Sequence, residues 1–161
     1  MRMFWLPTAI TMVCGAYAVA QTSSAKEVSH VPLREASPAV AVARAHVEAW
    51  SHHDWDKARV ILAPDVHVIA LTTQPVMAPT DLTGADNYME GLKKFAGAVV
   101  PGSARVTASI GDDRNALLML TVKAALGPGG AIVTLPAARL YLLDENRKIK
   151  VEQVIFFVTQ Q

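Results

Sequence analysis

The feature of the sequence that most constrains the fold is a pair of β-rich runs at residues 131–143 and 148–158. Both runs are dense in Val, Ile, Leu, Phe and Tyr, and the residues between them are polar with a turn-prone Asn, which is typical of an antiparallel hairpin. A two-residue loop and a four-residue loop predict the same register. The predicted cross-strand pairs are Leu135 with Phe156, Ala137 with Val154, Arg139 with Glu152, and Tyr141 with Lys150. Opposite charges on adjacent strands attract, so Arg139 and Glu152 support this register.

Side chains alternate along a strand, so the hairpin has two faces. One face carries Leu135, Ala137, Arg139, Tyr141, Glu152, Val154 and Phe156. The other carries Ala138, Leu140, Leu142, Ile149, Val151, Gln153, Ile155 and Phe157. Neither face is polar enough to lie bare in water, so we expect helices of the same chain to cover one face and a second subunit to cover the other, giving a homodimer. The face that holds an Arg–Glu pair among apolar residues is the predicted wall of a binding cavity.

The first twenty residues predict a secretory signal peptide. Arg2 gives a basic start, residues 4–19 are mostly apolar, and Ala18-Val19-Ala20 matches the small-x-small cleavage pattern. An uncleaved membrane anchor and a lipoprotein attached at Cys14 are the alternatives. We expect the mature chain to begin at Gln21 and to be exported, either to the periplasm or out of the cell.

The composition of the mature chain argues against several classes of partner and site. The 161 residues suffice for one domain with a substantial core. Cys14, the single cysteine, would leave with the signal peptide, so no disulfide is expected. Removal of Arg2 takes the basic residues from 15 to 14, against 14 acidic residues, and without a basic tract we expect no nucleic-acid partner. No stretch after Ala20 is long and apolar enough to span a bilayer, and no cofactor is predicted.

Two helices are predicted after a flexible, polar lead-in at residues 21–37. Ser37 as N-cap and Pro38 at the first helical position begin a helix that runs to about Ser51. Its inner stripe is Val40, Ala43, Val47 and Trp50. Asp54 is expected to cap a second short helix that continues through Leu62.

The rest of the chain is predicted to be mostly strands, with one more helix. We expect a strand at 66–71, and we interpret residues 72–82 as a loop with a short edge strand near 76–78. Thr83 and Asp86 form a capping-box-like start for the third helix, whose inner side includes Tyr88. Strands at 104–110 and 116–126 precede the hairpin. The order predicts an α+β domain at 38–161, in which a curved antiparallel sheet wraps around three N-terminal helices.

In this order of elements, four short motifs resemble the nuclear transport factor 2-like superfamily, which includes SnoaL-like polyketide cyclases, ketosteroid isomerases and limonene epoxide hydrolase. The motifs are Trp50 with His53-Asp54-Trp55-Asp56, Ala63-Pro64-Asp65-Val66, Thr83-Gly84-Ala85, and Leu143-Asp144-Glu145-Asn146-Arg147-Lys148-Ile149. In the last motif Arg147 stands where the family usually has Gly. The resemblance covers residues 38–158 and implies a cone-shaped α+β barrel of the cystatin-like kind. It implies the fold more than the chemistry, because this fold hosts unrelated activities.

The catalytic residues of two branches of this family are not found at the matching positions. The isomerases use an Asp base, with a Tyr and a protonated Asp as hydrogen-bond donors. Counted along the resemblance, the Tyr position falls on His46, the base position on Ala70 and the second Asp position on Arg139. The acid of the epoxide hydrolase would fall at about Val154, two residues after Glu152 on the same face. The resemblance therefore does not imply that this chain uses the mechanism of the isomerases or that of the epoxide hydrolase.

Six residues are predicted to line a ligand cavity, and each also has a purely structural interpretation. They are His46, Tyr88, Arg139, Tyr141, Glu152 and Phe156. The structural interpretations are a cross-strand ion pair for Arg139 and Glu152, a satisfied half-buried His46, and ordinary core lining for the tyrosines. If Glu152 neutralises Arg139, the cavity is expected to favour a polar neutral ligand. If Glu152 turns away, the cavity is expected to favour a carboxylate, which Arg can hold with two hydrogen bonds.

No metal site is predicted. His52-His53-Asp54 is interpreted as a solvated loop and helix cap, because adjacent side chains diverge and no second cluster completes a ligand shell. His67 alternates with apolar neighbours and faces either the helices or a partner; the pattern does not decide between the two.

Three functions follow as hypotheses. The first is an exported protein that binds a small, largely apolar molecule in its cavity. The second is an enzyme of the cyclase, isomerase or hydrolase kind, with His46 or Glu152 as the catalytic proton-transfer group. The third is a non-catalytic interaction module whose interior is filled by its own side chains.

Overall fold

The computed structural model describes residues 32–72, 80–125 and 130–157. These residues belong to one compact unit, Val31–Gln161. The predicted signal peptide at 1–20, with Cys14, lies outside the described residues, as does the edge strand predicted near 76–78. In the described ranges, no helix is long and apolar enough to cross a membrane.

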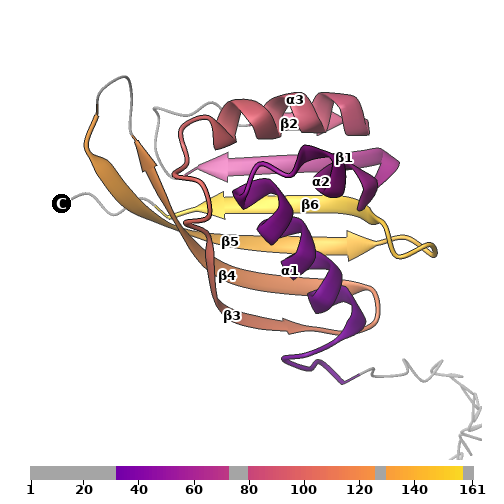
Figure 1. The fold of residues 1–161 in the computed structure, drawn as a ribbon. Coiled ribbons are helices and arrows are strands. Elements are labelled where there is room, and N and C mark those ends of the chain that lie inside the picture. The colour runs from indigo at the N-terminus through magenta and orange to yellow at the C-terminus, as the bar shows by residue number, and fades with distance from the viewer. Residues whose placement is uncertain (1–31, 73–79, 126–129, 158–161) are drawn as a thin grey trace, which may run out of the picture. The chain divides into compact units, whose positions relative to one another are not determined.

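Three helices and six strands make up the described part of the chain. In order they are α1 (Pro38–Ser51), α2 (Trp55–Val60), β1 (Leu62–Thr72), β2 (Thr80–Thr83), α3 (Ala85–Ala96), β3 (Arg105–Gly111), β4 (Asn115–Ala125), β5 (Ile132–Leu143) and β6 (Ile149–Phe156). The strands form one curved sheet in the order β2-β1-β6-β5-β4-β3, with the helices on one face (Figure 1). The predicted α+β class with a curved sheet wrapped on helices is confirmed.

The sheet departs from a purely antiparallel arrangement at one pairing. The last strand, β6, lies between β1 and β5, and it runs parallel to β1. The other pairings, β1 with β2 and the β3-β4-β5-β6 meander, are antiparallel as predicted. As a result, the first and last strands of the unit lie side by side (Figure 1).

The first two helices begin where their capping residues predict. The Ser37 hydroxyl accepts a hydrogen bond from the Val40 amide at 3.2 Å, and the Asp54 carboxylate accepts one from the Lys57 amide at 3.2 Å. The second helix ends at Val60, earlier than predicted. It ends there because Leu62 already belongs to β1 and pairs with Ile149 of β6.

The start of the third helix differs from the predicted capping box. Gly84, with a φ of 91°, is the N-cap of α3, and it makes no side-chain capping bond. Thr83 instead ends the edge strand β2, opposite His67 of β1. The segment predicted as a loop up to residue 82 therefore ends in an ordered strand that shares a sheet with β1.

The register of the C-terminal hairpin is shifted by two residues from the predicted one. Arg139 lies opposite Val154, and Tyr141 lies opposite Glu152. One residue of the shift comes from a three-residue turn, in which the Asp144 amide donates to the Lys148 carbonyl and Arg147 takes a φ of 58°. The other comes from a bulge beyond Leu142.

This shift of two residues leaves the two faces of the hairpin nearly as predicted, because a strand repeats every second residue. Ile149 is the exception. It was assigned to the outer face, but it lies beyond the bulge, opposite Leu143, and is fully buried. A bulge adds one residue to one strand, so the alternation of side chains reverses beyond it and Ile149 points inward.

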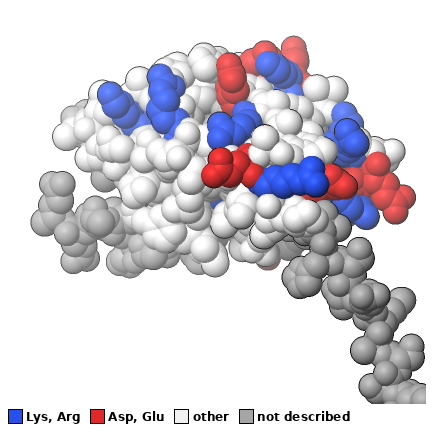
Figure 2. All heavy atoms as spheres, turned by 90° about the horizontal axis from the view of Figure 1, so that it is seen from below, with Lys and Arg blue, Asp and Glu red and all other residues white. Residues whose placement is uncertain are grey.

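One part of the core lies where α1 crosses β3, β4 and β5. Trp50 of α1 is fully buried, as are Leu118 of β4 and Tyr141 of β5. The other end of the same sheet face is covered by α3, which lies over β1 and β2 (Figure 1). On the face shown in Figure 2, basic side chains lie among acidic ones, in keeping with the formal net charge of +1.

Candidate functional site

A cavity of about 130 Å³ lies between α3 and the β2-β1-β6-β5 side of the sheet. Its wall is formed by Val68, Ala70, Thr80, Leu82, Tyr88, Gly91, Leu92, Phe95, Arg139, Glu152, Val154 and Phe156. Most of these side chains are apolar, and the charged exceptions are Arg139 and Glu152. Gly91 of α3 faces Leu82 of β2, and a Cβ atom at residue 91 would lie 2.7 Å from Leu82 Cδ1 and displace the end of that side chain.

The charged residues in the wall form a buried ion pair. Arg139 Nη1 donates to Glu152 Oε1 at 2.6 Å, and the side chains are only 3% and 1% exposed. The Arg139 guanidinium lies 4.6 Å from the centre of the Trp50 ring, so an aromatic face from α1 supports it. A carboxylate and a guanidinium this close neutralise each other, so the pair adds polarity to the cavity wall without net charge.

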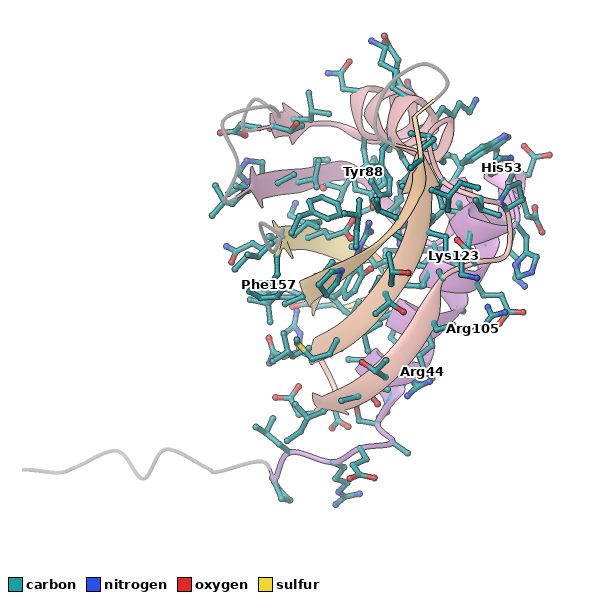
Figure 3. All side chains as sticks on the ribbon, turned by 90° about the vertical axis from the view of Figure 1, so that its left-hand side faces the viewer. Arg44, His53, Tyr88, Arg105, Lys123 and Phe157 are labelled. Carbon is teal, nitrogen blue, oxygen red and sulfur yellow. The ribbon has the colours of Figure 1, made fainter. Side chains whose placement is uncertain are left out.

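Tyr88 connects this pair to α1. It projects from α3 toward the sheet (Figure 3), and its hydroxyl donates a hydrogen bond to Glu152 Oε2. The same hydroxyl lies 3.4 Å from His46 Nε2. Each oxygen of Glu152 therefore already accepts one hydrogen bond, one from β5 and one from α3.

Burial and the neighbouring charges determine the protonation of the cluster. Burial lowers the pKa of His46 to about 4, although the Glu152 charge acts in the other direction. Burial alone would raise the pKa of Glu152, but the Arg139 charge and the Tyr88 hydroxyl hold it below its ordinary value. Burial alone would lower the pKa of Arg139, and the Glu152 charge raises it instead. Burial, followed by the Glu152 charge, raises the pKa of Tyr88 and Tyr141. At pH 7 the cluster thus holds one cation, one anion and three neutral groups.

Several buried polar atoms around the pair lack a hydrogen-bond partner among the described residues. They are Arg139 Nε, Tyr141 Oη, Trp50 Nε1 and His46 Nδ1. Tyr141 is close enough to Glu152 and Arg139 to affect their pKa values, but its hydroxyl has hydrogen-bond geometry to neither. Unpaired buried polar atoms are uncommon in folded proteins, and here they gather around one buried ion pair.

The comparisons with known proteins agree with this architecture. The family model of the SnoaL-like domain matches residues 43–152. This chain belongs to the SnoaL-like domain family. No curated protein matches it by sequence.

Solved structures similar to this SnoaL-like domain share its fold. A protein from Kribbella flavida is 25% identical with a TM-score of 0.61, over 74% of this chain and 87% of that one. A protein with a ketosteroid isomerase-like fold from Catenulispora acidiphila, in complex with trimethylamine, is 12% identical with a TM-score of 0.58, over 73% and 85% of the two chains. An LEH-like epoxide hydrolase from M. tuberculosis is 18% identical with a TM-score of 0.57, over 74% and 83%.

The SnoaL-like domain brings four of the six predicted site residues to the cavity wall. These are Tyr88, Arg139, Glu152 and Phe156. His46 and Tyr141 do not line the cavity and lie behind Tyr88 and the ion pair, with their ring centres 6.0 Å apart. His46 is also fully buried, not half-buried.

Sequence reasoning missed the part of the wall that comes from β1 and β2. Val68 and Ala70 alternate with outward-facing residues of β1, and Leu82 lies opposite Val68 on the edge strand. Alternation along β1 was the available signal, but the position of β2 was not apparent from the sequence. His67 turns to the outer face, where Nε2 lies 2.6 Å from Asp81 Oδ1.

The His52-His53-Asp54 trio makes three separate local contacts. His52 Nδ1 lies 3.0 Å from the Glu48 carbonyl, the His53 ring stacks on Trp55, and Asp54 caps α2. Among the described residues, no group of three or more His, Cys, Asp or Glu side chains is arranged to hold a metal ion.

Proposed function

We propose that this SnoaL-like protein binds a small, largely apolar molecule in the cavity under α3. The observation that carries the proposal is an apolar cavity whose wall contains one buried, neutralised Arg139–Glu152 pair. Ligand sites typically combine apolar lining with a small number of placed polar groups. Among the similar structures, one is named as an LEH-like epoxide hydrolase, and another is a complex with trimethylamine. Each description refers to a small molecule.

The size of the cavity limits the ligand. Its volume of about 130 Å³ is close to that of an engineered cavity of about 150 Å³ in another protein that takes up benzene. A single six-membered ring is therefore about the largest group that the cavity encloses. Larger ligands would have to extend out of the cavity.

Mass spectrometry of the natively purified protein, before and after denaturation, tests this proposal. We expect a small molecule that is released on denaturation and is depleted in an Ala70→Leu variant, because the longer side chain fills the cavity that Ala70 lines. Ala108→Leu is the matched control, since Ala108 is an exposed β-strand alanine on β3. Equal recovery from both variants would contradict the proposal.

The second candidate function is an enzyme that uses Glu152 or His46 for proton transfer. The favouring observation is that Tyr88 and Glu152 line the cavity and that the Tyr88 hydroxyl contacts both Glu152 and His46. Glu152 would act on the substrate directly, whereas His46 does not line the cavity and would act through Tyr88. Turnover of lactones, epoxides or enones that is lost in Tyr88→Phe would support the enzyme, and binding without turnover would support the binding protein. The third possibility, an interaction module with a filled interior, is less well supported because the cavity is present.

We also propose a homodimer through the outer face of the sheet. This face carries partly exposed apolar side chains on β4 and β6, namely Leu117, Met119, Val151 and Ile155, and Phe157 follows β6 directly. Phe157 projects from the side of the sheet opposite α1, which carries Arg44 (Figure 3). Contiguous apolar surface of this kind is typical of protein–protein interfaces.

Export remains a proposal that rests on the N-terminal sequence. We propose that residues 1–20 direct the chain to the periplasm or out of the cell and are then removed. N-terminal sequencing of the protein recovered from the exported fraction tests this. A mature start at Gln21 supports the proposal, and a retained Met1 contradicts it.

A further inference from the structure

We infer that Gln153 fixes the geometry of the proposed homodimer: it lies on the two-fold axis, where its side-chain amide pairs with Gln153 of the partner subunit. The inference rests on the proposed homodimer, because it assigns the residue at the centre of the same outer sheet face.

Gln153 is a polar residue in the middle of an apolar surface. It lies on β6, opposite Leu140 of β5 on one side and Ile69 of β1 on the other. Val151 and Ile155 lie before and after it on the same face of β6, because side chains alternate along a strand. All four nearest neighbours of Gln153 on the outer face are therefore apolar.

The apolar surface continues across the sheet on both sides of Gln153. One row of Cα partners runs from β3 to β1 through Ile110, Leu117, Leu140, Gln153 and Ile69. Gln153 itself is exposed, and its amide has no hydrogen-bond partner among the described residues. The amide is therefore available to a group outside the chain.

A partner that covers this face would bury the Gln153 amide, and a buried amide without a hydrogen bond is unfavourable. In a dimer of identical chains, the neighbours of Gln153 would offer the amide only apolar side chains. His67, a polar residue of the same face, already contacts Asp81 at 2.6 Å. An amide carries both donors and an acceptor, so two Gln153 side chains satisfy each other through reciprocal hydrogen bonds.

A second copy of this chain is the partner that fits this arrangement. Most homo-oligomers have closed symmetry, and a residue of a two-fold dimer meets its own copy on the axis. Gln153 is uncharged, and the Asp81 charge at the margin already has His67 as its partner in the same chain, so an identical copy brings no like charge to the centre. A single polar residue within an apolar interface fixes the register of the two chains.

Charge-swap variants test whether residue 153 meets residue 153. We expect Gln153→Glu and Gln153→Lys each to weaken self-association by at least about hundredfold at pH 7.5, because like charges then meet on the axis. An equimolar mixture of the two should associate to within about tenfold of the wild type, since opposite charges then face each other. Gln153 is exposed, so neither substitution alters the core. Sedimentation velocity over a range of concentrations measures each sample.

The matched controls carry the same pair of substitutions at Leu117 and at Phe157, which are exposed to a similar extent. Leu117 lies in the same row as Gln153 but two strands away, whereas Phe157 follows β6 along the strand direction. The row and the strand cross at Gln153, so a straight axis through Gln153 passes through at most one of the two control positions. At least one control mixture should therefore show no recovery.

The outcomes separate this inference from the proposed homodimer. If the wild type stays monomeric at all concentrations, the proposed homodimer is overturned and this inference with it. If the wild type dimerises but the Gln153 mixture does not recover, or either single Gln153 variant dimerises like the wild type, the homodimer stands and the assignment of Gln153 to the axis is overturned. Equal recovery at Gln153, Leu117 and Phe157 also overturns it, because a general attraction of opposite charges would then suffice.

Discussion

Arg139 and Glu152 contact each other at 2.6 Å although they are not opposite each other in the sheet. Arg139 lies opposite Val154, and Glu152 lies opposite Tyr141, so the ion pair runs diagonally across β5 and β6. The Arg side chain is long enough to reach a diagonal neighbour on the next strand. It places both charged groups on the concave face under the helices.

Replacing one member of this ion pair should lower the free energy of unfolding far more than replacing both members together. Glu152→Leu or Arg139→Leu alone should lower the free energy of unfolding by about 3–5 kcal/mol, because each leaves a buried charge uncompensated. The double variant should lose much less than the sum of the two. Urea denaturation in a double-mutant cycle measures this. The control cycle is the exposed Asp65–Lys150 pair, where the coupling should be much smaller because solvent screens the charges. Additive losses at Arg139 and Glu152 would contradict the argument.

His46 should make the protein less stable as the pH falls toward 4. Its folded pKa is lowered to about 4, below the unfolded value of 6.5, so the unfolded chain binds a proton that the folded chain does not between these two values. Stability should therefore rise with pH through this window, by about 3 kcal/mol from His46 alone. Urea denaturation at pH 4.5 and pH 7 measures it. His46→Phe should remove most of the dependence in that window, whereas His52→Asn, at the exposed end of the same helix, should keep it.

The hydroxyl of Tyr88 should stabilise the fold more than the hydroxyl of Tyr141. Tyr88 donates to the Glu152 carboxylate, and hydrogen bonds to charged groups contribute about 1.5–3 kcal/mol. The Tyr141 hydroxyl has no hydrogen-bond partner within the described residues, so Tyr141→Phe should cost less than about 1 kcal/mol. Both residues are buried and both substitutions remove one oxygen, so each is the control for the other. Equal losses in chemical denaturation would be evidence against the Tyr88–Glu152 bond.

Self-association should depend on the outer sheet face. Ile155→Lys puts a charge into the exposed apolar surface of β6, and it should weaken a dimer by at least about tenfold because an unpaired charge is costly in an interface. Val60→Lys is the control, since Val60 is also an exposed apolar residue but lies on α2. Sedimentation velocity over a range of concentrations measures the association. A wild-type protein that stays monomeric at all concentrations would rule out the dimer.

Much of the fold was predictable because its signals are local. The Ser37-Pro38 signal gives the start of the first helix, which is observed at Pro38. Alternation along β5 and β6 assigns nearly every side chain to its observed face, so Arg139 and Glu152 could be placed together on the inner side. The fold class followed from the order of these elements.

The parts that were not predictable depend on geometry that residue type does not reveal. Arg147 adopts a positive φ, a conformation usually taken by Gly, in a turn of three residues, whereas the predicted loops had two or four. The bulge beyond Leu142 and the parallel pairing of β1 with β6 arise from long-range packing. The depth of His46 depends on how α1 lies on the sheet, so its position behind the cavity wall could not be read from its helical spacing.

Methyl-resolved NMR with cyclohexanone is the most direct test of the proposed cavity. We predict that the methyl resonances of Val68, Leu82, Leu92 and Val154, which line the cavity, shift saturably. Those of Leu118 and Val122, buried in the sheet away from the cavity wall, should stay in place. Shifts confined to outer-face residues such as Leu117 and Ile155, or no shifts at any concentration, would contradict ligand binding under α3.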